Sequence, residues 1–248
     1  TIENGVLKSD DENVDTKNSS VVMRDERSSI GISKKAVDGT EELPGALLTV
    51  ELVTPADSDA AEFDKDKIYV NGGASDISIG KTTIKFVSGD KPSTITGLPD
   101  GEYTLTETTS PDGYTLSNEV KKFTIKDGKP SSDEVEMIDA PSVVSVSKME
   151  VNGSAEIPGA VIKLTLTESS KTKDATLKSQ INSTVKAAND DVTAITWTSS
   201  DKPVVLTGLP DGKYVLEETI PPVGYAITEN IEFTIENGVL KSDDENVD

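Results

Sequence analysis

Short runs in which apolar and polar residues alternate recur along the whole chain. Val, Ile, Thr and Leu supply most of the apolar positions, as in YTLTE at 103–107. Successive side chains of an extended strand point to opposite faces, so this alternation favours half-buried strands. Turn sequences such as LPDG, at 98–101 and again at 209–212, separate the runs. The pattern predicts small all-β domains with thin cores.

The chain contains two copies of one pattern. Residues 85–114 match residues 196–225 at an offset of 111, and residues 31–52 match residues 145–166 at an offset of 114. We expect seven or so strands in each copy, folded as Ig-like β-sandwich modules that follow one another in an elongated rod. The polar stretch 169–191 is expected to hold one short helix or an exposed loop.

The first fifteen residues recur, unchanged, as residues 234–248. The chain therefore reads as a window on a tandem array with a period of 233 residues. In this interpretation residues 1–28 are the C-terminal strands of a preceding module, residues 29–141 form module one, and residues 142–248 form module two, which lacks its last strand. We expect the chain to be a piece of a longer protein.

Composition narrows the function classes. The formal net charge is −21, from 45 acidic and 24 basic residues, and it argues against nucleic acid as a partner. There is no Cys and no His, which excludes disulfides, thiolate zinc sites and histidine-based catalysis. The acidic stretch 57–67 has carboxylates but lacks the spacing and central Gly of an EF-hand loop, so calcium remains a weak alternative there, and we predict no cofactor and no metal site. No apolar run has the length of a membrane span, and no signal peptide is recognised.

Two pairs of motifs carry a family resemblance over nearly the whole chain, twice. ISKKAVDGTEELPGA at 32–46 pairs with VSKMEVNGSAEIPGA at 146–160, and YTLTETTSPDGY at 103–114 pairs with YVLEETIPPVGY at 214–225. Both pairs resemble the Cna-B-like, or SpaA-type pilin, domains of Gram-positive surface adhesins and pili. In that family a first-strand Lys, a Glu of the E-box strand and a last-strand Asn or Asp react unaided to form an isopeptide bond across the core.

Strand parity selects the residues to which the resemblance assigns these roles. Lys34 shares a face with Ile30 and Ile32, whereas Lys35 points the other way. The same parity holds for Lys148 in module two. A lone strand Lys or Glu is more commonly solvated, and an Asp beside a turn is commonly a surface residue. The resemblance implies instead Lys34 and Lys148 as the amines, Glu107 and Glu218 as the proton shuttles, and Asp139 as the acid of module one.

Asp25 is the predicted acid for module two. Val21, Met23 and Asp25 repeat the alternation of the last strand of module one, and nine residues separate Asp25 from Lys34, as nine separate Asp139 from Lys148. Residues 26–29 span only about 13 Å when extended, which is too short to bring Asp25 back to Lys148 of the same chain. We therefore expect Asp25 to pair with Lys148 of an adjacent repeat or of another chain, head to tail.

Burial is expected to favour the neutral amine and the protonated acid, while Glu107 moves the proton from the attacking nitrogen to the leaving oxygen. Each site reacts once, so no enzyme in the usual sense is predicted. The expected function is a stalk or repeat segment of a cell-wall-anchored, extracellular adhesin or pilus-like fibre of a Gram-positive bacterium, whose host ligand would bind a tip domain outside this chain. The alternative is a module that itself binds a host protein or glycan.

Overall fold

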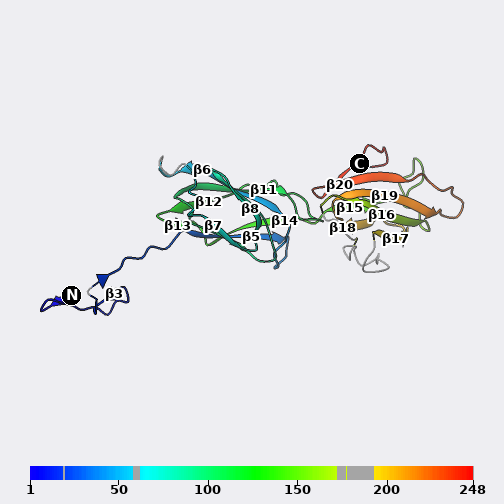
Figure 1. Cartoon of the computed structure of the whole chain (residues 1–248). Helices are drawn as coiled ribbons and strands as arrows, with labels where there is room; N and C mark the ends of the chain where they lie inside the picture. The colour runs from blue at the N-terminus through cyan, green and yellow to red at the C-terminus, as the bar shows by residue number, and fades with distance from the viewer. Residues whose placement is uncertain (19, 58–61, 172–176, 178–192, 248) are drawn as a thin grey trace.

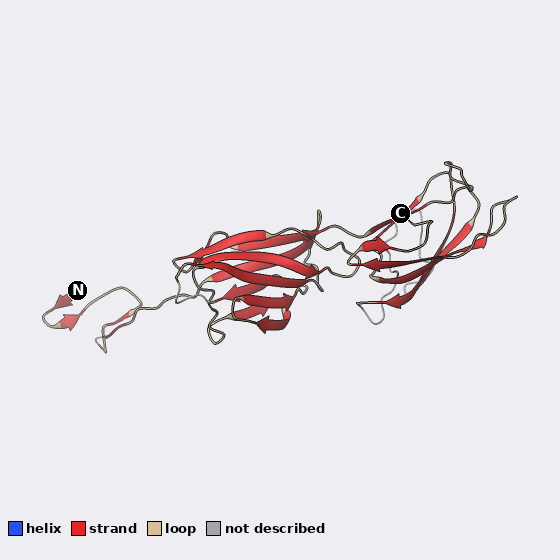
Figure 2. Cartoon of the chain, turned by 90° about the horizontal axis from the view of Figure 1, so that it is seen from above, coloured by secondary structure: helices blue, strands red, loops and turns tan. Residues whose placement is uncertain are grey.

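The computed structural model describes residues 1–18, 20–57, 62–171, 177 and 193–247. These residues form strands, turns and loops that build two β-sandwich-like modules, arranged end to end, and an N-terminal segment that extends from the free end of module one (Figures 1 and 2). The predicted all-β tandem architecture is confirmed. Most of the stretch 169–191 lies outside the described residues. Within the described part, no helix has the length and apolar character needed to cross a membrane.

Module one is made of two facing sheets with ten strands among the described residues, rather than about seven. The four-stranded sheet has the order β14-β5-β10-β7, and the six-stranded sheet has the order β13-β12-β11-β6-β9-β8. The excess comes from short strands, such as β7 and β8 in the long connection after β6 and the two-residue β13. The strands are β5 (Ser29–Ala36), β6 (Leu47–Pro55), β7 (Tyr69–Gly72), β8 (Ser75–Ile79), β9 (Thr83–Val87), β10 (Ser93–Thr96), β11 (Gly101–Thr109), β12 (Lys121–Lys126), β13 (Lys129–Pro130) and β14 (Glu134–Asp139).

Module two repeats most of this plan. A five-stranded sheet has the order β17-β16-β19-β20-β21, and β15 pairs with β18 in a separate two-stranded sheet. Its strands are β15 (Val143–Val146), β16 (Val161–Ser169), β17 (Ala194–Thr198), β18 (Val204–Thr207), β19 (Gly212–Ile220), β20 (Ile231–Glu236) and β21 (Val239–Lys241). Among the described residues no strand corresponds to β14, so β15 is paired on one edge only.

Equivalent aromatic residues fill the two cores. Tyr103 stacks on Phe123 with ring centroids 5.0 Å apart, and Tyr214 stacks on Phe233 at 5.2 Å. Each tyrosine hydroxyl donates to the carbonyl of a proline in the preceding turn, at 2.6 Å in both modules. A buried phenol therefore keeps a hydrogen-bond partner, and each ring pair ties an E-box strand to its neighbour.

The repeated fifteen residues form the same hairpin at both ends of the chain. In the N-terminal copy β1 (Ile2–Glu3) pairs with β2 (Val6–Leu7), and in the C-terminal copy β20 pairs with β21 in the same register. The two turn residues have positive φ in both copies, 52° and 78° at Asn4 and Gly5 and 50° and 73° at Asn237 and Gly238. Asn-Gly is the preferred sequence of such a tight turn, so the hairpin is encoded locally. A second small hairpin, β3 (Val14–Asp15) with β4 (Ser20–Val21), follows the N-terminal copy.

A network of hydrogen bonds fixes the joint between the modules. Ser142 N donates to Gly113 O at 2.9 Å, and Leu116 N donates to Asn237 O at 3.1 Å. Lys171 Nζ donates to Ser110 O at 2.9 Å and lies 2.7 Å from Asp211 Oδ2. The loop after β11 of module one is thereby held against turns of module two, and the joint is a built interface rather than a bare linker.

Asp211 holds the hairpin turn of module two at this joint. Its carboxylate accepts from Asn237 N at 2.6 Å and from Gly238 N at 2.9 Å, and Asp100 accepts equivalently from Asp127 N at 2.6 Å and Gly128 N at 3.0 Å in module one. The Asp211 side chain is only 2% exposed. Its loss leaves two backbone donors without a partner and removes the ion-pair partner of Lys171.

We predict that Asp211→Ala lowers the free energy of unfolding of module two by about 2–3 kcal/mol. Trp197 is the only tryptophan and lies in the core of module two, so urea unfolding followed by its fluorescence reports this module. Asp100→Ala is the matched control, because it removes the same turn contact from module one, and it should leave the tryptophan curve in place. Equal shifts of the tryptophan unfolding curve in both variants would contradict the role of Asp211 in stabilising module two.

Candidate functional site

The candidate site of module one begins with two adjacent parallel strands. β14 pairs with β5 in parallel, with Met137 opposite Lys34 and Asp139 opposite Ala36. Ile30, Ile32 and Lys34 are buried on one face of β5, and Val135, Met137 and Asp139 are buried on the same side of β14. Lys35 points outward, where its Nζ lies 2.7 Å from Glu136 Oε2. The parity that the sequence predicted for both strands is thus observed.

Three ionisable side chains meet inside module one. Lys34 Nζ is in ionic contact with Asp139 Oδ1 and lies 3.4 Å from Glu107 Oε1, which comes from β11 in the facing sheet. The side-chain exposure is 1% for Lys34 and 0% for both acids. Lys34 Nζ, Glu107 Oε1 and both Asp139 oxygens make no hydrogen bond of ordinary geometry within the described part of the chain. The cluster is therefore desolvated and held by its own charges.

Burial controls the electrostatics of Glu107. The pKa of this carboxyl is raised to about 7, chiefly by desolvation and also by the neighbouring Asp139, although the Ser117 N–H and the Lys34 ammonium act to lower it. A carboxyl with a pKa close to neutrality both takes up and releases a proton at physiological pH, as a proton shuttle must.

Backbone donors and a second glutamate orient the cluster, and the sequence reasoning missed them. Ser117 N donates to Glu107 Oε2 at 2.8 Å, and Glu42 Oε2 accepts from Lys34 N at 2.8 Å. Thr228 N and Glu156 occupy the same places in module two, at 2.9 and 2.8 Å. The repetition of this glutamate in EELPGA and AEIPGA was the available signal, but nothing in one sequence says that it binds the backbone of the lysine strand.

Module two contains two of the three groups. Lys148 Nζ lies 3.2 Å from Glu218 Oε1, and Glu218 is buried. The Lys148 side chain remains 17% exposed, against 1% for Lys34. Within the described residues its only ion-pair partner is Glu218. Asp25 is exposed and belongs to the N-terminal segment. That segment extends from the end of module one remote from module two (Figures 1 and 2). Its pairing with another copy stays a prediction.

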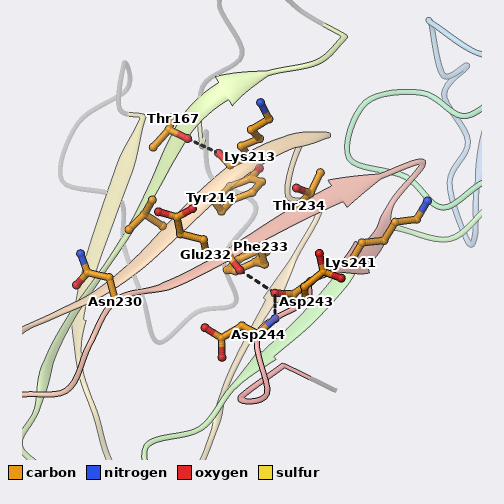
Figure 3. Close-up of a pocket in the computed structure, with 12 residues that line it drawn as sticks. Thr167, Lys213, Tyr214, Asn230, Glu232, Phe233, Thr234, Lys241, Asp243 and Asp244 are labelled. Carbon is orange, nitrogen blue, oxygen red and sulfur yellow. Dashed lines mark hydrogen bonds between the residues drawn. The ribbon is translucent and has the colours of Figure 1, made fainter.

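A shallow hollow on the outer side of module two offers no comparable chemistry. It lies between β19, β20 and the tail after β21 (Figure 3). Ser242 Oγ donates to Glu232 O at 2.8 Å and so ties the tail to the sheet. The lysines at its rim are paired, Lys213 with Glu168 at 2.7 Å and Lys241 with Glu236. Across the described residues no group of three or more acids is placed to hold a metal ion, and residues 58–61 of the acidic stretch lie outside them.

Comparison with protein families identifies both modules. A family described as the SpaA prealbumin-like fold domain matches residues 28–140 and residues 142–247. The chain belongs to this family. The SpaA family match thus covers each module separately, and it agrees with the likeness that the motifs indicated. No curated protein sequence matches the chain.

Solved structures with some likeness to this SpaA-family chain include surface proteins and pilins. The Bacillus anthracis TIE protein shares 21% identity over 85% of this chain and 31% of its own, with a TM-score of 0.43. The shaft pilin SpaA of Lactobacillus rhamnosus GG (D295N mutant) shares 17% over 84% of this chain and 94% of its own, with a TM-score of 0.36. A C-terminal fragment of the pilus adhesin SpaC from the same organism shares 16% over 86% and 83%, with a TM-score of 0.41. The chain thus spans less than a third of the length of the TIE protein structure.

We predict that Glu107 makes the stability of unbonded module one depend on pH. In Lys34→Ala the amine is lost and one attraction that lowers the Glu107 pKa goes with it, so the folded-state pKa stays above the ordinary value. Between about pH 4.5 and 7 the folded state then holds a proton that the unfolded state releases, and stability falls as the pH rises.

Scanning calorimetry of Lys34→Ala and of Lys34→Ala/Glu107→Gln between about pH 4.5 and 7 tests whether Glu107 causes this pH dependence. The transition of the single variant should shift downward with pH relative to that of the double variant, which has no carboxyl to titrate at position 107. Parallel pH profiles would show that Glu107 is not held protonated by burial.

Proposed function

We propose that this chain is a stalk segment of a cell-wall-anchored adhesin or pilus-like fibre on the outside of a Gram-positive bacterium, and that module one is closed by a self-formed bond between Lys34 and Asp139. The single observation that carries the proposal is the desolvated cluster of Lys34, Glu107 and Asp139 in a SpaA-family module. In this proposal the cluster reacts once and the protein is its own substrate, so the cluster is not an enzyme site in the usual sense.

The reaction joins the lysine amine to the aspartate carboxyl. A proton first passes from the Lys34 ammonium to the Asp139 carboxylate, and the neutral amine then attacks Cγ of the protonated carboxyl. A C–N bond forms and the C–O bond to the protonated oxygen breaks. Glu107 takes a proton from the nitrogen and delivers it to the departing oxygen, which leaves as water. The contact of the amine with the acid supplies the proximity that intramolecular reactions exploit, worth roughly 7–11 kcal/mol of barrier in well-oriented cases. The product is a neutral amide, which removes two charges from the core.

The strand arrangement explains how such a bond would serve a stalk. Tension enters module one at the start of β5 and leaves at the end of β14, and these two strands are parallel neighbours. A bond from Lys34 to Asp139 would carry that tension directly and bypass all residues between them. The sheets would then bear no extending force, and the module would keep its length under load.

We predict that the intact mass of the purified protein is lower than the calculated mass by one water for module one. Lys34→Ala and Glu107→Ala should each restore the full mass, because the first lacks the amine and the second lacks the proton shuttle. Asp139→Asn should lose ammonia instead of water. Lys35→Ala is the matched control, since Lys35 lies on the outer face of the same strand and should leave the loss of water unchanged. A full mass in the parent protein would overturn the proposal.

A further variant, Glu107→Gln, tests the contribution of the bond to stability. By the loop-closure analysis used for disulfides, a cross-link that closes a loop of about a hundred residues stabilises the fold by about 4–5 kcal/mol. Glu107→Gln retains the size and shape of the site, so its loss of stability relative to the parent should be of this order. The measurement is urea unfolding of module one followed by circular dichroism, with Lys35→Ala expected to unfold like the parent.

A further inference from the structure

The loop after β11, residues 110–117, connects the candidate site of module one to the joint. At the end of this loop, Ser117 N donates to Glu107 Oε2 at 2.8 Å. Two residues earlier, Thr115 N donates at 2.8 Å to the carbonyl of Ala140, which directly follows the last residue of β14. The loop therefore holds the glutamate of the site and the end of the strand that carries its aspartate.

Module two holds the same loop from the other side. Asp112 Oδ1 accepts from Asp211 N at 2.7 Å, and Leu116 N donates to Asn237 O at 3.1 Å. Leu116 immediately precedes Ser117, the residue whose N–H binds the glutamate. The contacts made by module two thus reach to within one residue of the candidate site.

The hairpin turn of module two, Asn237 and Gly238, lies so close to this loop that it has no room for a side chain. A Cβ atom at Gly238 would lie 2.4 Å from Tyr114 O and 2.6 Å from Thr115 Cα, which are backbone atoms that no change of rotamer can move away. The equivalent glycine of module one is Gly128, and its φ is 72° against 73° at Gly238. In the described part of the chain, only its own neighbours in sequence lie within 4 Å of a Cβ at Gly128. Both turns need the backbone freedom of glycine, but only the turn at the joint also needs the absence of a side chain.

We propose that the hairpin turn of module two positions the loop that orients Glu107, so that the bond of module one closes faster when module two is folded and docked. This inference rests on the lysine–aspartate chemistry proposed above. Asn237 and Gly238 act through residues 114–116 and not on the reacting atoms, so they are positioning residues. Module one would then become cross-linked only after its neighbour has taken its place in the stalk.

The hydrogen bond to the glutamate follows from the loop itself, since Thr228 N donates equivalently to Glu218 in module two. The contribution of the joint is to fix where the loop lies. A proton shuttle works only within hydrogen-bond reach of the atoms that it serves, and a displacement of about 1 Å can slow a reaction by as much as about a hundredfold. A change that pushes residues 114–116 away from the joint therefore acts on the reaction in module one.

Displacement of the loop also changes the titration of Glu107. Desolvation raises the pKa of this carboxyl, and the Ser117 N–H is the largest influence that lowers it. The charged groups that act on Glu107 are Lys34 of β5 and Asp139 of β14, and neither belongs to the loop. Loss of the Ser117 hydrogen bond should therefore raise the pKa of Glu107.

Gly238→Ala and Gly128→Ala in the full chain test the proposal. Each protein is recovered unreacted from inclusion bodies in urea and refolded by dilution, and the loss of one water from module one is followed by mass spectrometry. Gly238→Ala should react about tenfold more slowly than the parent at pH 7, because its loop is displaced. Gly128→Ala is a strict control, since it places the same backbone strain in module one itself, and it should react at the parent rate. Equal rates in Gly238→Ala and the parent, or equal slowing by both variants, would overturn the proposal.

The pH dependence of the rate separates positioning from a general folding defect. The fluorescence of Trp197 first establishes that module two of Gly238→Ala is folded. The rising limb of the rate profile should then lie at higher pH in Gly238→Ala than in the parent, because a carboxyl with a raised pKa needs a higher pH before it can accept a proton. A rate lowered by the same factor at every pH would overturn the positioning role.

A titration that does not require the reaction distinguishes failure of this inference from failure of the proposed function. In the Lys34→Ala background no bond can form, and the carboxyl carbon of Glu107 is followed by NMR, with Glu107→Gln to assign its signal. Adding Gly238→Ala should raise the titration midpoint, and adding Gly128→Ala should not. If the parent loses water but Gly238→Ala changes neither rate nor midpoint, the positioning inference fails alone. If the parent keeps its full mass, the proposed function fails, and the titration still decides whether the turn positions Glu107.

Discussion

The buried contact between Lys34, Glu107 and Asp139 is the constraint around which module one is organised. A charge removed from water is tolerated only when its partners lie within bonding distance, so two strands of one sheet and one strand of the other must meet in a fixed register. The parallel pairing of β5 with β14 and the position of β11 opposite them satisfy that requirement. Conversion of the ion pair into an amide would replace a costly arrangement of charges with a neutral link.

Module two repeats the arrangement of module one, without a counterpart of β14 among the described residues. The glutamate stays buried and keeps its backbone donor, the lysine keeps its contact with that glutamate, and the two cores use equivalent aromatic pairs. Around the lysine the two modules differ, since β15 is shorter than β5 and Lys148 is more exposed than Lys34. Among the described residues, only module one brings all three ionisable side chains together.

The joint between the modules is connected to the candidate site of module one through the loop after β11. The loop after β11 provides the Ser117 N–H that binds Glu107, and the same loop contacts module two through Gly113 and Leu116. The residue that orients the candidate proton shuttle of module one is thus on a segment anchored by the next module. In the proposed stalk, these contacts would restrict movement at the joint more than a bare linker does.

Much of the site followed from sequence because strand parity is a local property. Lys34 and Asp139 each share a face with apolar residues two and four positions away, and this parity, together with the family resemblance of the motifs, predicted their place inside the module. Sequence did not reveal Glu42 as the residue that binds the backbone of Lys34, or Lys171 as a bridge across the joint. Both roles depend on segments brought together by the fold, over distances along the chain at which no periodicity applies.

The repeated fifteen residues show which features the local sequence determines and which depend on the tertiary structure. Their sequence by itself determines a tight Asn-Gly hairpin, because the positive φ angles suit those two residues, and the hairpin forms both at the isolated N-terminus and inside module two. Only the tertiary structure decides what the hairpin does. Ile2 is 74% exposed and Ile235 is 0% exposed, although the two occupy the same position in the same sequence, because burial requires a second sheet to cover the side chain and no short sequence contains that sheet.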